Sequence, residues 1–135
     1  MSYALPFAIG LAMALANIAI TWRLPPQRAA GFYNLFMAAT AAFYFGSALP
    51  SGNLNILLRE IAVSGTLFCL ALAGQWKSLK FTAAAFAAHG IWDLLHVTQG
   101  MGANAGTNFP VLCVAYDWVI AGYLWWWLAP RTKTN

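Results

Sequence analysis

The chain has 135 residues, of which 61% are hydrophobic and 7% are charged, and its mean hydropathy is +0.65. Soluble domains carry about 25% charged residues, so this chain has too few to cover a surface that faces water. The composition excludes a soluble enzyme, a disordered tail and a disulfide scaffold. The net charge of +4 reflects a scarcity of acids rather than a basic patch, and this excludes a nucleic-acid partner. What remains is a polytopic membrane protein.

Five apolar stretches reach the length of about 20 residues that a membrane-spanning helix needs. The first stretch does not have the pattern of a cleaved signal peptide, because no basic residue precedes it and Arg23-Leu24-Pro25-Pro26 follows it directly. We therefore expect an all-α bundle of five transmembrane helices, which forms a single domain over residues 1–135. The predicted spans are 4–22, 29–49, 54–76, 79–97 and 109–129.

The cations near the ends of the predicted spans indicate how the bundle is oriented. They fall in or directly beside alternate connections and after the last span, so all of them lie on one side, and cytoplasmic loops are the ones that carry an excess of Lys and Arg. The opposite connections, around Gly52 and over 99–108, carry no charge. We expect a multi-pass protein of a bacterial plasma membrane, with its N-terminus outside and its C-terminus in the cytoplasm. The cations are Arg23, Arg28, Lys77, Lys80, Arg131 and Lys133.

Every acid and both histidines lie inside the predicted spans. A charged side chain in hydrocarbon costs about 2.5–3.5 kcal/mol on the insertion scale, so such residues face the bundle interior, pair or line water. A rise of about 1.5 Å per residue places Glu60, Asp117 and the polar residues of the fourth span in one outer-leaflet layer. Within that span His89, Asp93 and His96 are spaced i, i+4 and i+7, and so share one helical face. The sequence therefore predicts one polar site in this layer.

The side chains of this layer are typical of a metal site. Two histidines with carboxylates from other helices match the ligands of zinc, iron and manganese, and helical bundles build such sites from residues three or four apart. We predict that His89, Asp93 and His96 bind a divalent metal ion. Glu60 and Asp117 are the predicted catalytic proton acceptors, and no nucleotide cofactor is expected.

The polar residues of the last three predicted spans also form a recognisable pattern. A Glu in the third span is followed by His-x-x-Trp-Asp-x-x-His in the fourth and by Pro110-x-x-Cys113-x-x-x-Asp117 in the fifth. This pattern resembles a family of small bacterial integral membrane proteins that is filed as a domain of unknown function. The resemblance covers roughly the C-terminal two-thirds of the chain, and it implies no reaction. It does imply that one recurrent pattern contains Glu60, His89, Asp93, His96 and Asp117.

Three functions remain open at this point. The first is a metal-dependent membrane enzyme that acts on a lipid or other apolar substrate from the outer leaflet. The second is a transport element for protons or metal ions, although the inner half of the bundle offers no charged path. The third is a non-catalytic subunit of a homo-oligomer or a larger membrane complex, in which the polar layer is a buried network and Arg59 neutralises one acid. The lipid bilayer is an expected partner in all three.

Overall fold

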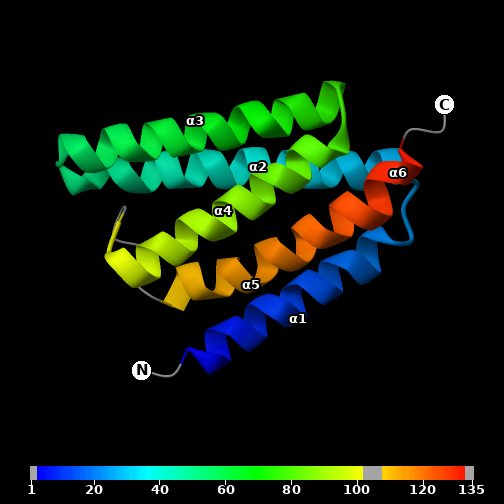
Figure 1. Cartoon of the computed structure of the whole chain (residues 1–135), viewed down its shortest axis with the longest axis horizontal. Coiled ribbons are helices and arrows are strands. Elements are labelled where there is room, and N and C mark those ends of the chain that lie inside the picture. Colours follow the sequence, from blue (N-terminus) through cyan, green and yellow to red (C-terminus); the bar gives the residue numbers. More distant parts are fainter. Residues whose placement is uncertain (1–2, 102–107, 133–135) are drawn as a thin grey trace.

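The computed structural model describes residues 3–101 and 108–132, and Figure 1 shows that this part of the chain is helical. No strand occurs among the described residues, so the predicted all-α class is confirmed. The long helices are α1 (Ala4–Thr21), α2 (Pro26–Ala48), α3 (Leu54–Trp76), α4 (Leu79–Gln99) and α5 (Asn108–Gly122). The shorter elements are the 3-10 turn η1 (Leu49–Ser51), the π-helical turn η2 (Tyr123–Leu128) and the terminal α6 (Ala129–Arg131).

Local sequence signals explain where the helices begin and end. α2 begins at Pro26, three residues before the predicted span, because proline is well suited to the first helical position. α3 begins directly after Asn53, whose side-chain oxygen accepts a hydrogen bond from the backbone N–H of Asn55 at 3.0 Å. α4 ends before Gly100, which adopts the left-handed backbone conformation (φ 64°) that stops a helix.

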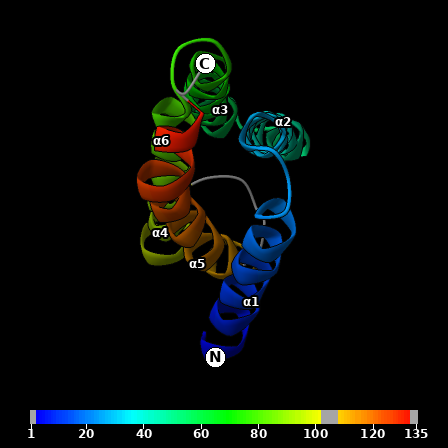
Figure 2. The same ribbon diagram turned by 90° about the vertical axis from the view of Figure 1, so that its right-hand side faces the viewer.

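The long helices form an open ring, which is seen nearly end-on in Figure 2. α2 packs on α3, α3 on α4, α4 on α5, and α5 on α1. α1 and α2 lie at the two ends of this ring. They are joined near their connection, where the hydroxyls of Thr21 and Tyr33 lie 2.8 Å apart, and they diverge toward the opposite end of the bundle. The buried core includes Met37, Phe86 and Ile120.

Four helices are long and apolar enough to cross a membrane: α1, α2 with its extension to Ser51, α3, and α5 with its extension to Arg131. The predicted fourth span does form a helix, α4, which is 21 residues long, but it is not among these four. Ionisable residues occur along its length and lower the mean hydropathy of α4. These residues are Lys80, His89, Asp93 and His96.

The described cations outside the helix interiors gather at one end of the bundle. Figure 1 shows the end of α1, the beginning of α2, the α3–α4 turn and α6 at this end. Tryptophans accompany the cations there: the rings of Trp22 and Trp127 stack at 4.3 Å, and the Arg131 guanidinium lies 3.2 Å from the centroid of Trp127. Lys133 lies outside the described residues. The opposite end of the bundle holds the polar side chains described below.

The contact between α1 and α5 depends on Gly10. A Cβ atom at this position would lie 2.1 Å from the backbone oxygen of Leu112, and a backbone oxygen cannot give way as a flexible side chain can. We expect Gly10→Leu to lower the free energy of unfolding in detergent by about 1–3 kcal/mol, measured by SDS titration. Gly31→Leu is the matched control, because a Cβ at Gly31 meets nothing within 4 Å. Equal effects of the two substitutions would contradict this account of the contact.

Candidate functional site

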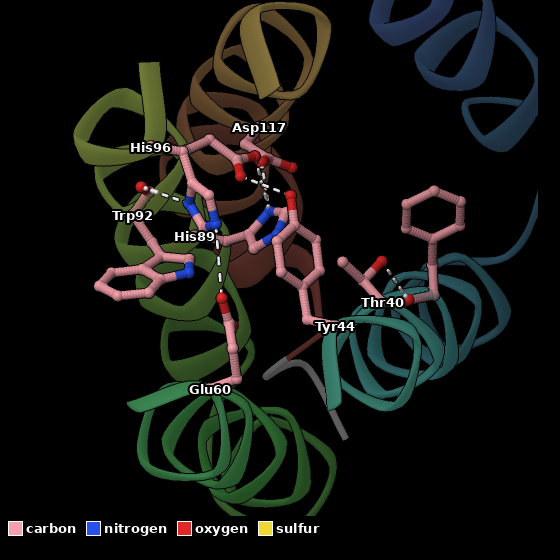
Figure 3. Close-up of polar contacts among 9 residues, drawn as sticks. Thr40, Tyr44, Glu60, His89, Trp92, His96 and Asp117 are labelled. Atoms are coloured by element: carbon pink, nitrogen blue, oxygen red, sulfur yellow. Dashed lines mark hydrogen bonds and ion pairs between the residues drawn. The ribbon is translucent and has the colours of Figure 1, made fainter. Parts of the chain in front are cut away.

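Polar side chains from four helices meet in the half of the bundle away from the cations (Figure 3). They include all three acids and both histidines of the chain. The carboxyls are almost completely buried: Glu60 and Asp93 are 0% exposed and Asp117 is 3% exposed. The contributing residues are Tyr44 of α2, Glu60 of α3, His89, Asp93 and His96 of α4, and Asp117 of α5.

The first group in the site is centred on the imidazole of His89. Its Nδ1 lies 2.6 Å from Oδ2 of Asp117 and 3.7 Å from Oδ2 of Asp93. The hydroxyl of Tyr44 donates a 2.5 Å hydrogen bond to the other oxygen of Asp93, Oδ1. One ligand atom from each of His89, Asp93 and Asp117 can be chosen so that all three lie within 4.8 Å of one another. These residues form the three-residue cluster discussed below.

Two buried atoms of the three-residue cluster have no hydrogen-bond partner among the described residues: Nε2 of His89 and Oδ2 of Asp93. A carboxylate can only accept a hydrogen bond, so the contact with Asp117 places the proton of a neutral His89 on Nδ1. Nε2 then presents a lone pair. Metal-binding histidines are commonly held in this way, with the second ring nitrogen bonded to a carboxylate.

The second group in the site pairs His96 with Glu60. The Nε2 atom of His96 lies 3.4 Å from Oε1 of Glu60. Its Nδ1 lies 3.1 Å from the backbone oxygen of Trp92, and because a carbonyl only accepts, this contact places a proton on Nδ1. The ring of His96 also lies edge-on to Trp92, with centroids 5.1 Å apart. The pair therefore has an imidazole held in one orientation with its Nε2 directed at a carboxyl group.

The structure divides the residues that the sequence assigned to one metal. His89 and Asp93 lie together, and the third member of their cluster is Asp117, which the sequence assigned to proton transfer. His96, the third predicted ligand, contacts Glu60 instead. The spacing explains the division, because residues seven apart on a helix share a face but lie about 10.5 Å apart along its axis. The backbone oxygen of Trp92 is a further contact that no sequence signal indicated.

An apolar cavity of about 340 Å³ borders the three-residue cluster on one side. It lies among α1, α2 and α5, and His89 and Asp117 form part of its wall, whereas Glu60 and His96 do not. The remaining lining residues are Met13, Phe36, Ala39, Thr40, Phe43, Phe109, Leu112, Cys113 and Tyr116. The two groups of the site therefore differ in their access to this cavity.

The bond from Tyr44 to Asp93 joins α2 to α4, and its loss can be measured. We expect Tyr44→Phe to lower the free energy of unfolding in detergent by about 1–3 kcal/mol, because it removes a donor from a buried carboxyl group. Thr40→Val is the control, since the one hydrogen bond of the Thr40 hydroxyl among the described residues goes to the backbone oxygen of Phe36 in its own helix. A Tyr44→Phe protein as stable as Thr40→Val would show that this bond does not stabilise the bundle.

Comparisons with known proteins identify the family to which the chain belongs. No curated protein and no solved structure matches it. The profile of DUF6010, described as a family of unknown function, matches residues 2–131. This range takes in all five long helices and the whole site, and so extends further than the resemblance noted from the last three predicted spans. The chain therefore belongs to the DUF6010 family, whose function is unknown.

Proposed function

We propose that this protein is a membrane-embedded enzyme in which His89 and Asp93 bind a divalent metal ion, with Asp117 holding the ring of His89, next to the cavity of an apolar, lipid-like substrate. One observation carries the proposal: three potential ligand atoms from two helices are buried and lie within 4.8 Å of one another, and two of the residues, His89 and Asp117, line an apolar cavity. Imidazole and carboxylate together suit zinc, iron or manganese.

The balance of charge in the site favours a bound cation. The three-residue cluster contains two carboxyl groups and one imidazole, and its members are 3% exposed or less. Even if the imidazole is protonated, two ionised carboxylates leave one net negative charge. An uncompensated buried charge is costly, so the site requires either additional protons or a bound cation. The unpartnered Nε2 of His89 and Oδ2 of Asp93 favour the cation.

Each residue has a separate role in this proposal. A bound metal ion would activate water or polarise a carbonyl group. Asp117 fixes the ring of His89 through Nδ1, and Tyr44 fixes Asp93 through Oδ1. Glu60 exchanges protons with His96, and the pair serves as the proton acceptor and donor of the site. The metal ligands and the proton carrier thereby lie on different turns of α4.

A structural network in a non-catalytic subunit would also bury these groups. It would not need an apolar cavity that ends at an imidazole, and this cavity is the reason for preferring an enzyme. The proposal places five helices across the bilayer, with the cationic end in the cytoplasm. α4 crosses although it carries the most ionisable residues of the five, because α3 and α5 cover its buried residues, which include His89 and Asp93.

Metal content tests the proposed ligands. We expect near-stoichiometric zinc, iron or manganese in protein purified in detergent without chelators, measured by mass spectrometry. His89→Ala and Asp117→Asn should each lose most of it, since losing an anchoring contact or ligand typically lowers metal affinity by about 10–100-fold. His96→Ala is the matched control, because His96 lies outside the three-residue cluster, and it should retain the metal. Wild-type protein that holds none of the three metals after reconstitution would overturn the proposal.

The orientation of α4 is tested by cysteine labelling in a Cys69→Ala/Cys113→Ala background. Lys77→Cys and Gln99→Cys flank α4, and both positions are exposed. In intact cells, a membrane-impermeant maleimide should label Gln99→Cys at once, and Lys77→Cys only after permeabilisation. Labelling of both positions from the same side would show that α4 does not cross the membrane.

A further inference from the structure

The cavity beside His89 indicates the kind of molecule that the site accepts. We propose that it binds a neutral single-chain amphiphile, such as a long-chain alcohol or ester, with the polar group at His89 and the adjoining part of the chain in the cavity. The rest of the chain extends between α1 and α2 into the bilayer. The reaction at the polar group rests on the proposed function, whereas the binding of the chain does not.

The cavity is bounded by two aromatic pairs that bridge α2 and α5. Phe43 and Phe109 lie with ring centroids 5.7 Å apart, and Phe36 and Tyr116 lie 5.4 Å apart. Phe36 and Phe43 are seven residues apart, which separates the pairs by about 10.5 Å along α2. Between them α2 presents the small side chains of Ala39 and Thr40 to the cavity. The result is a short slot between two aromatic walls.

The slot can be reached from the bilayer without passing through water. α1 and α2 diverge toward the end of the bundle where the site lies, as Figures 1 and 2 show, and α1 packs mainly on α5. Four large apolar side chains of the lining are 36–55% exposed, so the apolar wall continues to the outside of the bundle. These side chains are Met13, Phe36, Phe43 and Phe109.

The size of the cavity favours one hydrocarbon chain. Ligand pockets range over about 300–1,000 Å³, and the volume here, about 340 Å³, lies near the lower limit. A diacyl lipid would bring a second chain and a large headgroup to the same slot. Thus only one chain, and only the part of it next to the reacting group, is expected inside.

The polar end of the cavity favours a small neutral group. His89 is 1% exposed, lines the cavity, and has no hydrogen-bond partner for Nε2 among the described residues. In Figure 3 its ring lies between Asp117 and Tyr44, with Thr40, another lining residue, beyond Tyr44. Of the described residues that line the cavity, none is Lys or Arg, so no side chain there would balance a phosphate. A hydroxyl or carbonyl group meets these conditions.

Photocrosslinking tests this inference directly. The probe is hexadecanol with a diazirine near its hydroxyl end, added to the purified full-length protein in nanodiscs, and the labelled peptides are identified by mass spectrometry. We expect saturable labelling of lining residues such as Met13, Thr40 and Leu112. Unlabelled hexadecanol should compete, whereas a monoacyl phosphate of the same chain length should not. Unsaturable labelling spread over all lipid-facing helices, or equal competition by the phosphate, would overturn the inference.

A variant pair tests the position of the chain. Ala39→Trp should fill the slot and reduce the affinity for the probe about tenfold, because overpacking costs about 1–3 kcal/mol. Ala42→Trp is the control, since Ala42 lies in the same helix but borders a surface hollow shared with α3. It should label as the wild type does. An equal reduction in both variants, with both equally stable in detergent, would show that the chain does not occupy the slot.

The metal measurement separates the two proposals. Metal-bound protein that shows no saturable labelling would overturn the inference and leave the metal site intact. Saturable labelling of metal-free protein, with no metal recovered from any preparation, would support the binding of the chain and overturn the metal-dependent reaction. The labelling is therefore carried out both with and without the metal that the wild-type protein retains.

Discussion

Burying three carboxyl groups among apolar helices costs free energy, which protonation, hydrogen bonds or nearby positive charge must offset. The arrangement of the bundle follows from this constraint. α4 carries one carboxyl group and both imidazoles, so it must have partners on either side. α3 brings Glu60 to His96, and α5 brings Asp117 to His89. α4 therefore lies in the middle of the ring. α2 and α1 occupy the ends of the ring, and α2 contributes the hydroxyl of Tyr44 to Asp93.

This division of α4 also gives the site two chemically different halves. The three-residue cluster borders the cavity through His89 and Asp117. The pair of His96 and Glu60 does not border the cavity, and the backbone of Trp92 fixes the imidazole. In the proposed enzyme, the half beside the cavity receives the metal and the substrate, and the other half handles protons. Both halves depend on the register of a single helix.

The lengths of the apolar stretches were sufficient to predict five long helices. Their observed ends are set by residues such as Pro26, Asn53 and Gly100, which act through their own backbone neighbours. Periodicity was likewise sufficient to place the ionisable residues of α4 on one face. It could not predict that His89 and His96 contact different helices, because the face of a helix does not identify the helix packed against it. The cavity could not be predicted from the sequence for the same reason, because it depends on the pairing of α1 with α5 and on the divergence of α1 from α2.

The pairing of α1 with α5 has a consequence for the biosynthesis of the protein. Of the five long helices, α1 is the first in the chain, and its main partner, α5, is the fifth. At about 5–20 residues per second, roughly 5–20 s pass between the synthesis of the two helices. During this interval the nascent chain has no cavity and no Asp117, and the face of α1 that carries Gly10 has no α5 to pack against. The candidate site is complete only after α5 has been made and α1 has docked against it.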